Sequence, residues 1–133
     1  MNIFVDTSVW SLALRRDGPG GLFVAELTRA INAGDTVFTT GLIVQEILQG
    51  VSGPRQRVQI IARLALLPCL TPEWEDHVSA ADLFGRCRRA GVQIESVDAL
   101  LAQLCLRYDL TMLTADRDFH HIARHMPLRI WQA

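Results

Sequence analysis

Short runs of apolar residues alternate along the chain with longer stretches in which apolar residues recur at helical spacing. The first run, at 3–5, has polar neighbours on both sides, which is typical of a strand buried on both faces. Such runs predict strands at 3–5, 36–40, 68–70, 110–114 and 128–131. Helical spacing predicts helices at 8–16, 22–33, 41–50, 54–67, 72–91, 96–108 and 116–125. This alternation predicts an α/β fold, with a parallel sheet and helices on both faces.

Glycine, proline and small polar residues are expected to set the ends of these elements. The glycine- and proline-rich run 18–21 predicts a flexible loop, and Gly34 predicts the end of the preceding helix. Pro72 is suited to the first turn of a helix, and Ser96 is the expected N-cap of the helix that follows. The stretch at 68–70 is short and lies between breakers, so it is expected at an edge of the sheet.

The length of 133 residues favours one domain, 1–133, which can bury a core without disulfides. Half of the residues are hydrophobic and 20% are charged, which is typical of a globular chain. The cysteines are odd in number and form no C-x-x-C pair, so we expect a reduced compartment and three small core residues: Cys69, Cys87 and Cys105. Without a signal-like start or a membrane-length apolar run, the expected location is the cytoplasm.

The net charge of −1 gives no indication of a nucleic-acid partner, but all 13 basic residues are arginine. Arginine is suited to bidentate contact with phosphate, and clusters at 15–16, 55–63 and 86–89 would form local basic patches. Codon bias in a GC-rich genome explains the missing lysines more simply, and solvated helix faces are the default interpretation of such clusters.

Four acidic residues each have a simple local explanation. Asp6 would cap the helix that starts near Ser8, and Glu46 would be a solvated helix position. Asp98 would complement a helix dipole, and Asp116 would form an Asx turn. Taken singly, Glu46, Asp98 and Asp116 do not indicate a site, whereas Asp6, at the carboxyl end of a buried strand, is either a helix cap or the first member of one.

The expected placement of these acids favours a shared site. Asp98 projects from its helix on the side of Leu101 and Cys105, which should face the sheet. Asp6 and Asp116 each follow a strand directly, so they meet at the carboxyl edge if those strands are neighbours. Converging carboxylates repel unless a cation neutralises them, and oxygen-only ligands favour Mg²⁺ or Mn²⁺. Such an ion is suited to phosphate chemistry.

Four stretches of the chain carry a family resemblance. Val5-Asp6-Thr7-Ser8, Gln45-Glu46-Ile47-Leu48-Gln49-Gly50, Ser96-Val97-Asp98-Ala99-Leu100-Leu101-Ala102 and Leu113-Thr114-Ala115-Asp116-Arg117-Asp118-Phe119 resemble the acidic signature of PIN domains. The resemblance covers essentially the whole chain, and the layout is similar to VapC toxins of toxin–antitoxin pairs. It implies a three-layer α/β/α fold whose five-stranded parallel sheet has the order 3-2-1-4-5.

The resemblance also implies an activity and the residues that carry it. It implies an Mg²⁺- or Mn²⁺-dependent endoribonuclease that cleaves loops of transfer or ribosomal RNA, or messenger RNA, and so inhibits translation. The family's metal-site acids match Asp6, Glu46, Asp98 and Asp116, where Glu46 would bind a second ion or accept a proton. Ser8 and Thr114 match small polar positions, and Asp118 is held as secondary, capping the last helix.

The partners implied by the resemblance are an RNA substrate and other protein chains. A homodimer is expected, which binds a small VapB-like antitoxin in a larger hetero-oligomer. The antitoxin would often place an arginine among the acids. No membrane partner is expected.

Two other functions and two other features of the sequence offer alternative interpretations. A phosphotransferase of the haloacid-dehalogenase type also starts with a strand ending in aspartate, but it needs a second acid where this chain has Ser8. A non-catalytic binding module would not need inward-facing acids. His120, His121 and His125 invite a zinc site, although only two of them share a helix face. Trp10, Trp74 and Trp131 are expected in core or dimer packing more than in base stacking.

Overall fold

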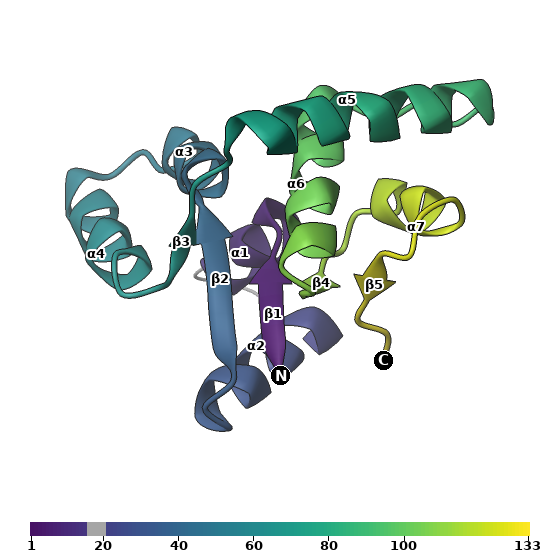
Figure 1. The fold of residues 1–133 in the computed structure, drawn as a ribbon. Helices are drawn as coiled ribbons and strands as arrows, with labels where there is room; N and C mark the ends of the chain where they lie inside the picture. Colours follow the sequence, from purple (N-terminus) through teal and green to yellow (C-terminus); the bar gives the residue numbers. More distant parts are fainter. Residues whose placement is uncertain (16–20) are drawn as a thin grey trace.

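The computed structural model describes residues 1–15 and 21–133, and it contains a five-stranded sheet (Figure 1). The strands are β1 (Asn2–Val5), β2 (Thr36–Thr40), β3 (Cys69–Leu70), β4 (Thr111–Leu113) and β5 (Arg129–Ile130). All four pairings are parallel and the order is β3-β2-β1-β4-β5. The predicted sheet and its order 3-2-1-4-5 are therefore confirmed, and 68–70 does contain an edge strand.

Helices connect the strands and cover both faces, which gives the predicted three-layer α/β/α arrangement (Figure 1). The helices are α1 (Thr7–Ala13), α2 (Gly21–Asn32), α3 (Gly41–Gln49), α4 (Pro54–Leu64), α5 (Trp74–Arg89), α6 (Ser96–Arg107) and α7 (Asp118–Ala123). In one group α1 contacts α2 and α3, and α3 contacts α4; in the other, α6 contacts α5 and α7. Within the described ranges, no helix is both long and apolar enough to cross a bilayer.

The central strand β1 explains why this sequence folds as it does. Ile3, Phe4 and Val5 are buried, because a middle strand of a parallel sheet has helices on both of its faces. The inward side of α6 is buried as expected, with Leu101 and Cys105 among its core residues. The register pairs Val5 with Leu113, so the residues that follow β1 and β4 emerge together at one edge.

Several element ends differ from the prediction. The N-cap before α6 is Glu95, with Ser96 as the first helical residue, so the prediction that Ser96 is the cap is wrong by one position. The helix predicted at 116–125 is shorter, because the chain at Asp116 forms a turn before α7 begins. The helix predicted at 8–16 ends at Ala13. The predicted loop at 18–21 lies outside the described residues except for Gly21.

The cysteines divide into two kinds. Cys87 and Cys105 are buried as expected, whereas Cys69 is exposed, so its assignment to the core is wrong. The physical reason is that β3 is a two-residue edge strand with solvent beside it. All three cysteines are free thiols.

Candidate metal centre

Two strands bring distant parts of the chain together at the carboxyl edge of the sheet. Asp6 follows β1 directly, and its backbone N–H donates to the carbonyl of Leu113 at 3.0 Å. This bond extends the parallel pairing of β1 with β4 by one residue, so that Asp6 lies beside Thr114. The predicted meeting of the chain after the first and fourth strands is therefore observed.

A network of hydroxyl groups surrounds the Asp6 carboxylate, which is almost entirely buried. Asp6 Oδ2 accepts hydrogen bonds from Ser8 Oγ at 2.7 Å and from Thr114 Oγ1 at 2.9 Å. It also accepts a longer bond from the Ser8 backbone N–H, since Asp6 is the N-cap of α1. Ser8 Oγ in turn accepts from the backbone N–H of Ala115 at 3.0 Å. Asp6 thus both caps α1 and belongs to the candidate site. Ser8 and Thr114 fix the orientation of its side chain.

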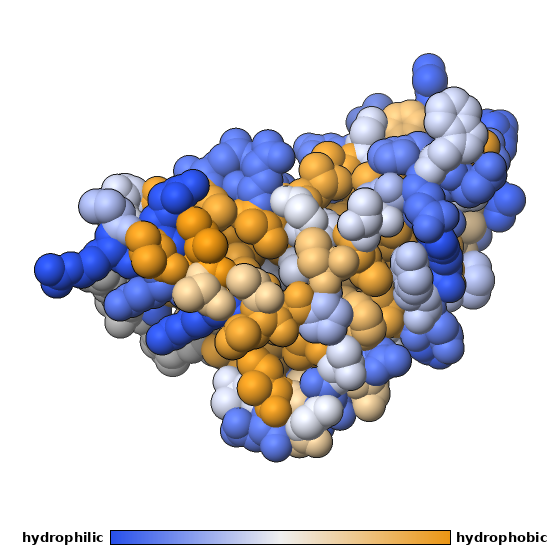
Figure 2. Space-filling model, turned by 60° about the vertical axis from the view of Figure 1, so that its left-hand side comes forward, coloured by the Kyte–Doolittle hydropathy of each residue, from blue (hydrophilic) through white to orange (hydrophobic). Residues whose placement is uncertain are grey.

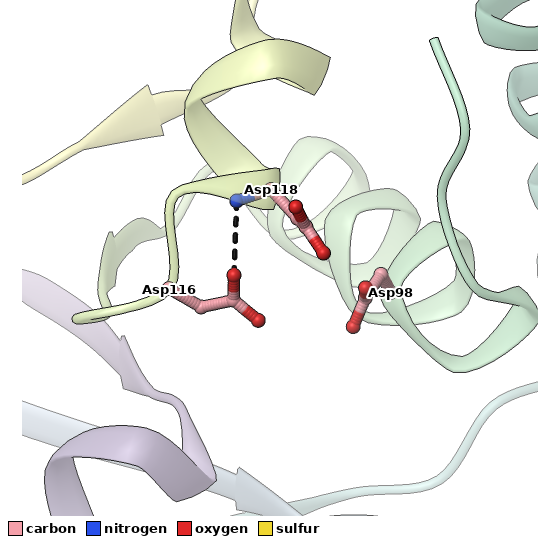
Figure 3. A group of neighbouring side chains, drawn as sticks. All are labelled: Asp98, Asp116 and Asp118. Carbon is pink, nitrogen blue, oxygen red and sulfur yellow. Dashed lines mark hydrogen bonds between the residues drawn. The ribbon is translucent and has the colours of Figure 1, made fainter.

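Three further carboxylates converge next to this network. Asp98 comes from the first turn of α6, Asp116 from the turn after β4, and Asp118 from the start of α7. One oxygen of each lies within 4.8 Å of the others, and Figure 3 shows the three side chains pointing into one space. We call Asp98, Asp116 and Asp118 the carboxylate trio.

A local turn sets the trio's geometry. Asp116 Oδ1 accepts a hydrogen bond from the Asp118 backbone N–H at 2.9 Å, which is the Asx turn considered for this position (Figure 3). The N-cap of α7 is Arg117, so the expectation that Asp118 caps the last helix is wrong. Asp118 instead turns its carboxylate toward Asp98 and Asp116. Its place in the trio was not predicted, although a second aspartate two residues after Asp116 was a visible signal.

The electrostatics of the trio favour a bound cation. Burial first, and then the negative charges of Asp116, Glu95, Asp6 and Asp118, together raise the pKa of Asp98 to about 7. Burial, with the charge of Asp6, also raises the pKa of the Cys105 thiol, which keeps this thiol protonated. A divalent cation would relieve the repulsion between the carboxylates. The donor set consists of carboxylate oxygens alone, which fits a hard ion such as Mg²⁺ or Mn²⁺.

Glu46 lies apart from the trio. It is an exposed residue of α3 whose Oε1 accepts a hydrogen bond from Thr7 Oγ1 at 3.1 Å. On its other side Glu46 lines a cleft of about 230 Å³ together with Ser11, Arg15 and Gln56. The structure therefore connects Glu46 to the Asp6 segment through Thr7 and does not place it among the three close carboxylates.

The other candidates from the sequence are not part of this centre. Across 1–15 and 21–133, the group of close metal-ligating side chains contains none of His120, His121 and His125, so zinc gains no support. Trp10 is buried, and Trp131 packs edge-on against Phe23 with ring centroids 5.9 Å apart, as expected for packing roles. Trp74 is exposed, which excludes core packing for this side chain and leaves dimer packing as the prediction.

Comparison with known proteins establishes the family. The PIN domain model matches residues 3–125, so the chain belongs to the PIN domain family. Among curated relatives, Ribonuclease VapC11 of Mycobacterium tuberculosis is 29% identical over 125 residues, which are 92% of each chain. VapC ribonuclease Mb1587 of Mycobacterium bovis matches to the same extent.

Solved structures share the fold at low identity. A chain of VapBC2 from Rickettsia felis, bound to a DNA fragment from their promoter, has a TM-score of 0.77 at 15% identity. That match covers 99% of this chain and 100% of the other. The family and the fold expected from the four motifs are thereby confirmed.

Proposed function

We propose that the protein is an Mg²⁺- or Mn²⁺-dependent endoribonuclease and the toxin of a toxin–antitoxin pair. The observation that carries the proposal is the convergence of Asp98, Asp116 and Asp118 beside Asp6, at the carboxyl edge of a PIN-family sheet. Relatives with matching length over most of the chain are named ribonucleases, which supports RNA as the substrate. Inhibition of translation would follow from cleavage of structured RNA.

We assign each residue of the site a role from its position. Asp98, Asp116 and Asp118 would hold the ion, with Asp6 oriented beside them by Ser8 and Thr114. All three hydrogen bonds to the Asp6 carboxylate reach Oδ2. Within the described residues none reaches Oδ1, so this oxygen stays available to the ion or its waters. A bound ion would lower the pKa of a water and polarise the phosphodiester. Glu46 would accept the proton of the attacking water or bind a second ion.

The RNA strand needs a path past the acids that does not repel its phosphates. The cleft beside Glu46 offers Arg15, Ser11 and Gln56, which supply a positive charge and neutral hydrogen-bonding groups. We propose this cleft as the approach of the strand, with a loop of transfer, ribosomal or messenger RNA as the substrate, because unpaired loops expose the backbone and bases.

The two alternative functions fit less well. A haloacid-dehalogenase-type phosphotransferase needs an acid where Ser8 lies, and the Ser8 hydroxyl is already hydrogen-bonded to Asp6. The chain also has no lysine to serve as a partner. A binding module without catalysis gives no reason for a trio of carboxylates in which burial, and then mutual repulsion, raises the pKa of Asp98.

An antitoxin is the partner that we propose for the apolar groove between α1, α2 and α4. This groove of about 380 Å³ is lined by residues that include Trp10, Leu14, Leu27, Ile31, Ile60 and Leu64. Figure 2, which brings the α4 side forward, shows apolar side chains gathered on this face. An apolar groove of this kind is suited to a side chain of a protein partner, and the solved structural relatives include VapBC complexes. The toxin itself is expected to be a homodimer.

The decisive experiment compares wild type with Asp6→Asn. RNA ends are sequenced after induced expression of each, and purified proteins are assayed with Mg²⁺, Mn²⁺ or EDTA. We expect discrete new ends and growth arrest with wild type alone, no cleavage in EDTA, and an unchanged circular dichroism spectrum for Asp6→Asn. Full-rate cleavage by Asp6→Asn in Mg²⁺ would contradict the proposal. Light scattering with and without the co-expressed antitoxin tests the assembly.

A further inference from the structure

Thr7, between Asp6 and Ser8, has no part in the hydroxyl network around Asp6. It is the first residue of α1, and its Oγ1 donates to Glu46 Oε1 across 39 positions of sequence. Successive side chains at the start of a helix project in directions about 100° apart. The two hydroxyls therefore donate hydrogen bonds to different acids: Ser8 donates to Asp6, and Thr7 donates to Glu46.

The two ends of this contact differ in rigidity. Thr7 follows a buried strand and Asp6, the N-cap of α1, whose backbone N–H donates a hydrogen bond to the Leu113 carbonyl, so the backbone of Thr7 is held in place. Glu46 is exposed and lines an open cleft, and a glutamate side chain with three rotatable bonds samples several rotamers there. Among the described residues, Thr7 supplies the one side-chain hydrogen bond to Glu46. The hydroxyl of Thr7 thus restricts the rotamer of an exposed carboxylate that has no other side-chain hydrogen bond among the described residues.

We propose that Thr7 is a positioning residue that holds Glu46 toward the metal centre for RNA cleavage. This inference rests on the proposed function, since it assigns Glu46 a task in the reaction. Thr7 touches neither the trio nor the Asp6 carboxylate through any described hydrogen bond, so its effect must pass through Glu46. This role requires a hydroxyl at position 7. We therefore expect serine at this position to preserve cleavage and valine to reduce it.

The first test uses Thr7→Val and Thr7→Ser with a defined RNA substrate in Mg²⁺. Valine keeps the shape and removes the donor, so we expect kcat to fall about tenfold, the size typical of a lost hydrogen bond to a charged group. KM should change less than twofold, and Thr7→Ser should restore kcat. Thr36→Val is the control for a threonine-to-valine change away from the site, because Thr36 is exposed and begins β2 at the opposite edge of the sheet, whereas Thr7 is half-buried. A Thr7→Val enzyme with wild-type kcat would overturn the role.

The second test asks whether the effect passes through Glu46. In a Glu46→Gln background we expect Thr7→Val to cause no further loss of kcat, because the carboxylate it orients is gone. Losses that multiply would show that Thr7 acts independently of Glu46 and would overturn the proposal.

A third measurement tests the hydrogen bond between Thr7 and Glu46 without an activity assay. The order parameter of the Glu46 γ-methylene, measured by NMR on the full chain, should fall in Thr7→Val and be retained in Thr7→Ser. An unchanged order parameter would overturn the positioning role even if wild type cleaves RNA. If wild type does not cleave RNA, the proposed function fails whatever the NMR result, so the two failures can be told apart.

Discussion

Thr114 and Asp6 are joined by a hydrogen bond across 108 positions of sequence: Thr114 Oγ1 donates to Asp6 Oδ2 at 2.9 Å. Thr114 Oγ1 also accepts the backbone N–H of Asp116 at 3.0 Å. A single buried hydroxyl therefore connects the acid after β1 to the turn that carries Asp116. The geometry of the candidate centre depends on this connection between the two central strands.

Replacing Thr114 by valine should weaken catalysis more than stability. The substitution keeps the volume but removes one donor from Asp6 and the acceptor for Asp116 N–H, which allows both carboxylates to reorient. We expect RNA cleavage to fall by about 10- to 100-fold, and the free energy of unfolding to fall by about 1–2 kcal/mol. Thr39→Val is the matched control, because Thr39 is equally buried in the neighbouring strand β2. Equal loss of activity in both variants would contradict a specific role for Thr114.

Removing one charge from the trio should stabilise the metal-free protein while it abolishes cleavage. Asp116→Asn relieves the repulsion that helps to raise the pKa of Asp98. In EDTA we expect the free energy of unfolding to rise by about 1 kcal/mol, as is usual when a strained functional site is neutralised. Differential scanning calorimetry with EDTA and with Mn²⁺ checks this, and Mn²⁺ should stabilise wild type alone. A lower Tm for Asp116→Asn in EDTA would show that the carboxylates do not repel.

The affinity for Mn²⁺ should depend on pH through Asp98. Burial and the neighbouring acids raise the pKa of Asp98 to about 7, so below pH 7 an ion must displace a proton to bind. We expect affinity to increase by up to about tenfold per pH unit between pH 5 and 7, and to level off above pH 7. For the same reason, the stability that Asp98 contributes without metal is highest at acid pH and declines as the pH rises toward 7.

Calorimetric titration of Mn²⁺ in two buffers with different ionisation enthalpies measures the displaced proton. Asp98→Asn should remove the proton release and most of the affinity. Asp82→Asn, at an exposed position of α5, is the matched control and should titrate like wild type. Wild-type binding that is independent of pH between 5 and 7 would contradict the elevated pKa.

Local sequence patterns predicted the elements and the edge of the sheet but not all of the site. The strand 36–40 was predicted with its observed limits, because its β-branched and aromatic residues lie between Asp35 and the helix start at Gly41. The burial of Asp98's side of α6 followed from helical periodicity. The strand order came from the family resemblance, since periodicity alone does not specify which strands are neighbours.

The errors in the prediction arise where tertiary contacts decide between local alternatives. Asp118 was expected to cap a helix, but Arg117 is the N-cap of α7. The Asp118 carboxylate instead lies close to Asp98, which comes from a helix distant in sequence. Thr7 was overlooked because its partner, Glu46, lies 39 positions away. The run Asp6-Thr7-Ser8 was nevertheless a signal, since two consecutive hydroxyls after an acid at a strand end supply donors in two directions.

The packing of α5 against α6 depends on an ion pair that the sequence did not reveal. Asp76 is fully buried, and Arg107 Nη1 donates to its Oδ2. Burial disfavours the charged carboxylate, but the hydrogen bonds from the Glu73 backbone and Arg107 outweigh it, so the pKa of Asp76 lies below its usual range. Arg107→Met should therefore leave a buried charge without its partner. We expect a loss of about 2 kcal/mol at pH 7, less than for a fully buried pair because Arg107 is partly exposed.

The pH dependence distinguishes this ion pair from ordinary packing. Because the folded-state pKa of Asp76 is lowered, its contribution to wild-type stability is present above the unfolded value of about 4 and is lost as the pH falls through the folded value. The deficit of Arg107→Met should therefore be larger at pH 7 than at pH 4, as measured by urea denaturation. Arg129→Met is the matched control, since its ion pair with Asp109 is exposed at both ends and should contribute less than about 0.5 kcal/mol. A deficit that is the same at both pH values would mean that Arg107 acts through its aliphatic contacts and not through its charge.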